Sequence, residues 1–120
     1  MEQLLHYVWK HKIFPLSALQ TTSGRPVEVI DPGLPNMNAG PDFFNAKLKM
    51  HGTLWVGNVE VHTQASEWLL HRHDCDKAYD TVILHVVGES NCDVYRTNGE
   101  LVPQMVLTCP DTVRMRYEEL

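Results

Sequence analysis

The chain has 120 residues, which is enough for one domain with a buried core but not for two. Hydrophobic residues make up 43% and charged residues 21% of it, values typical of a globular protein, so the composition argues against intrinsic disorder. The formal net charge of −5 argues against a sequence-independent nucleic-acid coat protein, which needs a basic surface, but leaves room for an enzyme that contacts nucleic acid locally.

The cysteines and the apolar runs bear on the cellular compartment. The 3 Cys are odd in number and have no CxxC spacing, so neither a disulfide scaffold nor a Cys-only zinc site is expected. No apolar run approaches the roughly 18 residues that cross a bilayer, and the first residues lack the layout of a signal peptide. We therefore expect a cytoplasmic protein with no membrane partner.

The first part of the chain predicts a helix, a strand and a long loop. Apolar residues recur at helical spacing over residues 2–13, and Pro15 is expected to end this amphipathic helix. Residues 26–31 alternate in polarity like a strand. Residues 31–41 are dense in Pro, Gly and Asn, which is incompatible with regular structure and typical of a functional loop.

The middle of the chain predicts a hairpin, a short helix and a buried strand. Residues 42–50 and 53–64 are strand-like and are separated by a short turn. A short helix is expected over 66–73, with Ser66 as its N-cap. Residues 81–88 form the most apolar strand, which we expect to be central in the sheet and buried on both faces.

A second hairpin is predicted from residues 92–97 and 101–108, and Pro103 places its later strand at a sheet edge. Residues 111–120 predict a helix that runs to the last residue without a stop signal. The expected fold class is therefore α/β, a mixed β-sheet with the order αβββαβ followed by a C-terminal β-hairpin. We expect residues 1–110 to form a single domain and residues 111–120 to begin a further helix of a longer chain.

Three polar residues lie where strands favour apolar ones: Asp42, Glu60 and His62. Alternation places Glu60, His62 and Gln64 on one face of their strand. A charge inside a sheet is costly unless it is paired, and two carboxylates with an imidazole can bind a hard divalent cation and position a water. The alternative is structural, with Asp42 as a turn residue and the others on a solvent-facing strand side or in a buried cross-strand pair.

The register of the first hairpin decides whether Asp42 joins this face. A two-residue turn pairs Asp42 with Val61, whose side chain points to the other side of the sheet. A longer loop or a bulge pairs Asp42 with His62, beside Glu60. The cluster therefore requires a bulge or a bend near Asp42, which we expect where the long loop meets the strand.

A second group of candidate ligands follows the predicted short helix. It contains His71, His73, Asp74 and Asp76, and His85 lies on the next strand. Neutral imidazoles with a carboxylate suit Zn²⁺ or another transition metal. His71 and His73 do not share a helical face, although an extended segment would bring them together. The competing interpretation is structural, with the first two histidines binding free carbonyl groups at a helix C-terminus and His85 as a hydrogen-bonded core residue.

The run NAGPDFFNAKL, followed by GNVEVHTQASEW and HRHDCDKAYDTVILHVV, resembles the start of an uncharacterised bacterial family, a domain of unknown function. The resemblance covers most of residues 1–90. It implies a considerably longer chain, in agreement with the open-ended C-terminal helix, so a missing C-terminal remainder is an expected partner.

A second resemblance is to the PD-(D/E)XK nucleases, whose pattern is Pro-Asp, a spacer, then Asp/Glu-X-Lys on the next strand of an αβββαβ core. Pro41-Asp42 matches the first part and Glu60-Val61-His62 the second. The resemblance implies that Asp42 and Glu60 bind Mg²⁺ or Mn²⁺ and that nucleic acid is the partner, which the acidic charge does not support. His62 stands where the nucleases have lysine, and a histidine is largely neutral at pH 7.

Three hypotheses about function remain open. The first is a divalent-metal phosphodiesterase in which Asp42 and Glu60 hold the ion, His62 activates or orients a water, and Gln64 helps to position the substrate. The second is a non-catalytic module whose chemistry has lapsed, which the lysine-to-histidine departure and the acidic charge favour. The third is a transition-metal site, with Zn²⁺ as its ion, built from His62, His71, His73 or His85.

Overall fold

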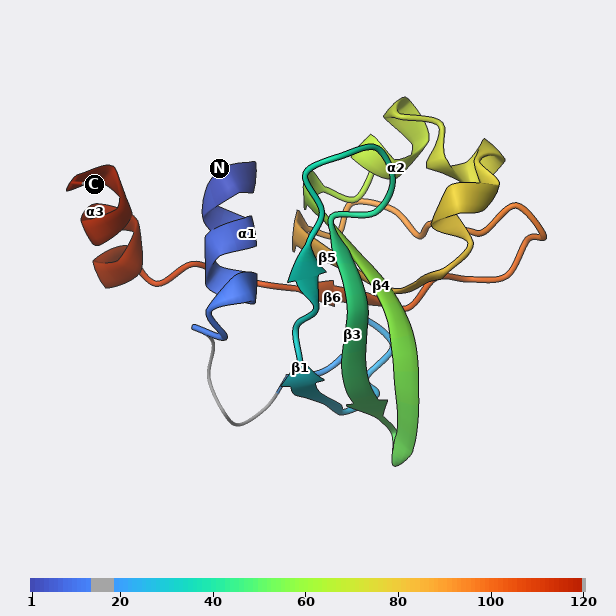
Figure 1. Ribbon diagram of the computed structural model, residues 1–120, viewed down its shortest axis with the longest axis horizontal. Helices are drawn as coiled ribbons and strands as arrows, with labels where there is room; N and C mark the ends of the chain where they lie inside the picture. The colour runs from blue at the N-terminus through green and yellow to red at the C-terminus, as the bar shows by residue number, and fades with distance from the viewer. Residues whose placement is uncertain (14–18, 120) are drawn as a thin grey trace.

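A mixed sheet of six strands organises the chain, which a computed structural model describes over residues 1–13 and 19–119 (Figure 1). The strand order is β1-β3-β4-β5-β6, and β2 pairs with β3. The pairs on the β1 side of β4 are antiparallel, whereas β4–β5 and β5–β6 are parallel, so the expected α/β class with a mixed sheet is confirmed. The strands are β1 (Val27–Asp31), β2 (Leu34–Pro35), β3 (Phe43–Met50), β4 (Thr53–Gln64), β5 (Val82–Glu89) and β6 (Gln104–Val106).

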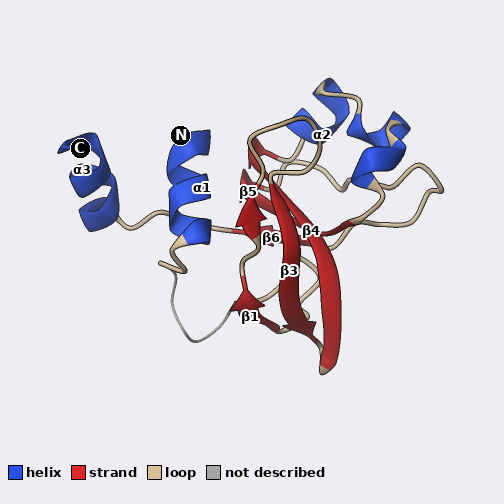
Figure 2. Cartoon of the chain, viewed as in Figure 1, coloured by secondary structure: helices blue, strands red, loops and turns tan. Residues whose placement is uncertain are grey.

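The helices α1 and α2 lie against this sheet, and α3 lies on the far side of α1 from it (Figure 2). In Figure 1, α1 and α2 lie on opposite sides of the sheet, while the β3–β4 turn extends away from α2. Within residues 1–13 and 19–119, no helix has the length and apolar character needed to cross a membrane. The helical elements are α1 (Glu2–Lys10), α2 (Glu67–Leu70), the 3-10 turns η1 (His73–Cys75) and η2 (Lys77–Tyr79), and α3 (Asp111–Glu119).

Each face of the sheet carries its own apolar core. The first lies under α1, whose predicted amphipathic pattern is confirmed because it packs Val8 and Trp9 against sheet residues such as Val61. The second lies under α2 and is built around Trp68 and Val87. The strand β5 contributes to both cores and lies between β4 and β6, so the prediction of a central strand buried on both faces is confirmed.

Two early elements differ from their predictions. The helix α1 ends at Lys10 rather than at residue 13, because Lys12 adopts a left-handed conformation with φ 54° that cannot continue a helix. Pro15, the predicted stop, lies outside the described residues. The segment 31–41 is not wholly irregular, since the two residues of β2 pair with the start of β3.

The β3–β4 hairpin has a two-residue turn and a bulge. The register shifts near Asn45, whose left-handed φ of 58° bends the strand. The predicted bulge near Asp42 is therefore present, but it displaces the register in the opposite direction, so that Asp42 lies level with Glu60 rather than opposite His62. The pairs that define the shift are Met50↔Thr53, Ala46↔Gly57 and Phe43↔Val59.

The predicted C-terminal hairpin is present only as a short turn. Residues 92–97 and 101–108 share the antiparallel bridge Tyr95↔Leu101 and the backbone hydrogen bonds Arg96 N–H to Glu100 O and Val102 N–H to Val94 O, and the later segment continues as β6 beside β5. The reason is the free edge of β5, where the backbone N–H of the buried His85 donates to Pro103 O at 2.8 Å. The prediction that the Pro103 segment lies at a sheet edge is confirmed.

Candidate functional site

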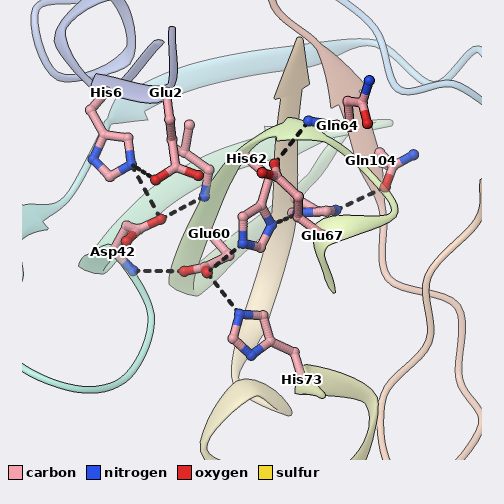
Figure 3. Close-up of polar contacts among 11 residues, drawn as sticks. Glu2, His6, Asp42, Glu60, His62, Gln64, Glu67, His73 and Gln104 are labelled. Carbon is pink, nitrogen blue, oxygen red and sulfur yellow. Dashed lines mark hydrogen bonds and ion pairs between the residues drawn. The ribbon is translucent and has the colours of Figure 1, made fainter. Parts of the chain in front are cut away.

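The bulge in β3 brings two carboxylates together at the start of the hairpin (Figure 3). The backbone N–H of Asp42 donates to Glu60 Oε1 at 3.1 Å. In return, Asp42 Oδ2 accepts a hydrogen bond from the backbone N–H of Val61 at 2.8 Å. This reciprocal pair fixes Glu60 so that its second oxygen, Oε2, points away from Asp42.

Glu60 Oε2 lies between two histidine rings. It is 3.2 Å from His62 Nε2 and 3.0 Å from His73 Nε2 (Figure 3). All three residues are almost inaccessible to solvent, at 4% for Glu60, 2% for His62 and 6% for His73. The contact joins His73, which the sequence analysis assigned to a separate group, to the carboxylate cluster on the hairpin.

The chain conformation at Arg72 explains why His71 and His73 converge. Arg72 is left-handed, with φ 59°, so it ends α2 after one turn and starts η1 in a new direction. The ring centroids of His71 and His73 lie 5.2 and 5.4 Å from that of His62. The predicted helix over 66–73 is therefore too long, and the two histidines meet because the helix has already ended.

Aromatic rings hold His73 in this position. Tyr79 stacks on the His73 ring with centroids 3.6 Å apart, and Trp68 meets the same ring edge-on at 5.3 Å. Trp68 is fully buried, while Tyr79 is half-buried. With rings on two sides, His73 has little freedom to leave the cluster.

His85 extends the cluster into the sheet. Its Nε2 lies 2.7 Å from His62 Nδ1, and its Nδ1 lies 2.9 Å from Gln104 Oε1. Both nitrogens of His85 are therefore engaged, which favours the core interpretation over the ligand interpretation for this residue. No sequence pattern predicts a role for Gln104, because its place beside His85 depends on the parallel pairing of β5 with β6.

Two further residues reach the cluster from α1, and one predicted residue does not reach it. His6 Nε2 lies 3.5 Å from Asp42 Oδ2 and 4.0 Å from Glu2 Oε2. The only sequence signal for these two residues was their place on the polar face of the helix. Gln64 is exposed and donates to Glu89 Oε2 at 3.1 Å, so it lies apart from the histidines.

One nitrogen from each of His62, His71 and His73 can be chosen so that all three lie within 4.8 Å of one another. This is the spacing of a site that could hold one metal ion, with Glu60 Oε2 beside it. His71 is the exposed member of the three. His71 and His73 of the second group therefore join Glu60 and His62 of the first group in one cluster, whereas Asp76 caps η2 by accepting from Ala78 N.

The comparison with protein families agrees with the first resemblance. Residues 2–120 match the family described as Protein of unknown function (DUF2851). The chain belongs to this family. Searches of curated proteins and of solved structures each found no match, so no structural neighbour of this DUF2851 chain supports the PD-(D/E)XK resemblance.

Burial determines the protonation states of Glu60, His62 and His73 in this DUF2851 chain. It raises the pKa of Glu60 to about 10, and the nearby Asp42 adds to this effect. Burial lowers the pKa of His62 to about 2, aided by the neighbouring His85 and His73, and it also lowers the pKa of His73. At neutral pH the carboxyl group of Glu60 keeps its proton and the imidazoles of His62 and His73 are neutral, which is the form of histidine that binds metals.

Two other features bear on whether a metal fits this DUF2851 site. The Nδ1 atom of His73 is buried and has no hydrogen-bond partner, which is costly for a polar atom. A cavity of about 720 Å³ lies elsewhere, lined by residues including Trp55, Asn58 and Arg96, and none of the clustered histidines borders it. The donor set and the unpaired nitrogen fit a metal ion better than they fit a closed hydrogen-bond network.

Proposed function

We propose that this chain is a metal-dependent hydrolase of phosphodiesters, with an ion bound by His62, His71 and His73 and with Glu60 as a fourth ligand or as a base. The observation that carries the proposal is the set of three histidine nitrogens within 4.8 Å of one another. Three protein ligands that leave one position for water are typical of catalytic rather than structural zinc sites.

The donor chemistry favours a transition metal over Mg²⁺. Imidazole nitrogen suits Zn²⁺, whereas Mg²⁺ prefers oxygen ligands and keeps several waters. Asp42 Oδ2 already accepts the Val61 N–H, and Asp42 N holds Glu60 Oε1. We therefore assign Asp42 the role of orienting Glu60, and we propose Zn²⁺ before Mn²⁺ and Mg²⁺.

The roles of the residues follow from their positions. A bound Zn²⁺ supplies a Lewis acid and a water of lowered pKa. Glu60, which lies between His62 and His73, would lose its proton to solvent as the ion is bound, and its carboxylate would then serve as a fourth ligand or as a general base. His71 is exposed, so the substrate approaches from its side.

The order of elements supports a phosphodiester substrate. Pro41-Asp42 leads into β3 and Glu60-Val61-His62 lies on the neighbouring β4, between a first helix and the crossover through α2 to the parallel strand β5. This order is similar to the one that the PD-(D/E)XK resemblance implies, apart from the additional strand β2, and it is our reason for proposing a phosphodiester. The net charge of −5 favours a local contact with one phosphodiester over a long nucleic-acid interface.

The burial of Glu60 and His62 favours a second candidate function. A metal that these residues enclose away from water would stabilise a non-catalytic module, as closed zinc sites do in small domains. This alternative uses the same ligands and differs only in whether an open position remains on the ion.

Calorimetric titration of the untagged chain with Zn²⁺, Mn²⁺ and Mg²⁺ tests both candidates. We expect one Zn²⁺ per chain and much weaker Mg²⁺ binding, with Zn²⁺ affinity reduced by His71→Ala and His73→Gln. His51→Asn is the matched control, because it removes an exposed histidine at the β3–β4 turn, away from α2, and asparagine tolerates the left-handed φ of 49° there.

The Zn²⁺-loaded chain is then assayed on bis(p-nitrophenyl) phosphate and on short DNA and RNA strands. Hydrolysis that His71→Ala abolishes and His51→Asn retains supports the enzyme. Zn²⁺ binding with no hydrolysis supports the non-catalytic module. Zn²⁺ binding that the histidine variants leave unchanged contradicts both candidates.

A further inference from the structure

Gln104 is held in one orientation by a backbone carbonyl. The residue is only 3% exposed, and its Nε2 lies 3.0 Å from Cys92 O and 2.7 Å from Ser90 Oγ. A carbonyl oxygen can only accept a hydrogen bond, so the amide atom that faces Cys92 O must be the NH₂ group. The other amide atom, Oε1, therefore faces His85.

This orientation determines where His85 carries its proton. Gln104 Oε1 only accepts, so the His85 Nδ1 that lies 2.9 Å away must be the N–H donor. His85 is fully buried in β5, and the hydrogen bonds of its ring go to Gln104 and His62 rather than to a carboxylate, so the neutral ring is favoured. A neutral imidazole has one N–H, which leaves His85 Nε2 as an acceptor.

The same argument determines which nitrogen of His62 carries the proton. Its Nδ1 lies 2.7 Å from His85 Nε2, and because that atom accepts, His62 Nδ1 must donate. The remaining nitrogen of His62, Nε2, then carries a lone pair and lies 3.2 Å from Glu60 Oε2. A relay of three side chains thus runs from the Cys92 carbonyl to the cluster.

We infer that Gln104 and His85 are positioning residues that hold His62 as the Nδ1–H tautomer and direct the lone pair of its Nε2 toward the candidate metal centre. The consequence for metal affinity rests on the proposed function, whereas the tautomer of His62 does not. Histidine ligands commonly donate their second N–H to an oriented acceptor, which fixes the tautomer that can bind the ion.

The sheet topology makes this relay. Glu60 pairs with His85 across β4 and β5, and His85 pairs with Gln104 across β5 and β6. Partners in parallel strands point to the same face, so the three side chains line one row across the sheet.

The tautomers are measured directly by long-range ¹H–¹⁵N correlation spectra of the histidine rings in the ¹⁵N-labelled, chelator-treated chain. We expect both His62 and His85 to be protonated on Nδ1. Gln104→Met, which has a similar length but no strong acceptor, should shift both rings toward the Nε2–H form. Ser90→Ala is the matched control, because Cys92 O alone still orients the amide of Gln104.

Zinc affinity supplies the second readout. We expect Gln104→Met to weaken Zn²⁺ binding about 10–100-fold, in line with the loss of other outer-shell partners of metal-bound histidine, and Ser90→Ala to leave it unchanged. Equal affinity in Gln104→Met and the wild-type chain would overturn the positioning role.

The outcomes separate this inference from the proposed function. If His62 of the wild-type chain is protonated on Nε2, the relay is contradicted whatever the metal titration shows. This spectrum of the wild-type chain tests the relay even if Gln104→Met does not fold. The expected tautomers in a chain that does not bind Zn²⁺ confirm the relay and contradict the metal centre.

Discussion

The Nε2 atom of His73 lies 3.0 Å from Oε2 of Glu60, and this contact joins a strand to the segment that follows a helix. Both residues are buried, and the pKa of Glu60 rises to about 10 because of that burial and the nearby Asp42. A protonated Glu60 can donate to one of the neighbouring imidazoles, so the metal-free cluster is held together by hydrogen bonds between neutral groups.

Replacement of Glu60 by glutamine tests this neutral state. Gln keeps an acceptor for Asp42 N and a donor toward His73 Nε2, so we expect Glu60→Gln to change the free energy of unfolding at pH 7 by less than about 1 kcal/mol. Glu60→Ala leaves both partners unpaired and opens a void, at a cost of about 3 kcal/mol. Urea denaturation of the chelator-treated chain measures both, and equal destabilisation by the two variants would contradict a neutral Glu60 that donates a hydrogen bond.

The stability of the metal-free chain should be greatest near pH 6.5. Below this pH the unfolded chain protonates its histidines, whose usual pKa is 6.5, whereas burial lowers the pKa of His62 to about 2 and that of His85 to about 4 in the folded chain. The unfolded state then binds more protons, so the free energy of unfolding rises with pH up to about 6.5.

Above pH 6.5 the sign reverses because of Glu60. Its usual pKa is 4.5, so the unfolded chain has lost this proton while the folded chain keeps it up to a pKa of about 10. Stability is therefore lost as the pH rises, at up to about 1.4 kcal/mol per pH unit. Thermal unfolding across the pH range should show this alkaline decline in the wild-type chain and not in Glu60→Gln, while both retain the acidic decline; a decline of equal slope in both would assign it to another group.

The stacking of Tyr79 on His73 yields a separate prediction. Because the two rings are 3.6 Å apart, Tyr79→Ala should free His73 to change its orientation and weaken Zn²⁺ binding about tenfold. Tyr79→Phe keeps the aromatic face and should retain the affinity, which separates the ring from the hydroxyl group. Calorimetric titration of the three chains measures this, and a loss in Tyr79→Phe as large as in Tyr79→Ala would contradict a role for stacking.

Local patterns in the sequence predicted much of the sheet and the need for the bulge. The alternation over residues 53–64 placed Glu60 and His62 on one face, and the continuous apolar run over residues 81–88 marked the central strand, because each pattern depends only on neighbouring residues and on burial. The face that Glu60 and His62 share also holds His85, which pairs with Glu60 between the parallel strands β4 and β5.

The rest of the site depends on contacts between distant segments. The place of Gln104 follows from the pairing of β6 with the free edge of β5, whereas the local turn signal predicted only the short turn that precedes β6. His6 reaches Asp42 only because α1 docks on the sheet, a contact that no local pattern encodes. The direction of the register shift at Asn45 was equally inaccessible, since a sequence shows that a bulge is needed but not which strand carries the extra residue.

Arg72 is the least predictable position and the subject of the last prediction. A left-handed φ of 59° is uncommon for arginine, and here it turns the chain so that His71 and His73 both face His62. Glycine adopts this conformation without strain, so Arg72→Gly should retain the Zn²⁺ affinity. Its free energy of unfolding should equal that of the wild-type chain or be slightly higher. Arg72→Val removes the same exposed charge but disfavours positive φ by about 1–2 kcal/mol, so it should extend the helical turn and reduce Zn²⁺ affinity at least tenfold. Because both variants lose the guanidinium group, equal affinities in Arg72→Gly and Arg72→Val would show that the backbone conformation at this position does not assemble the histidine cluster.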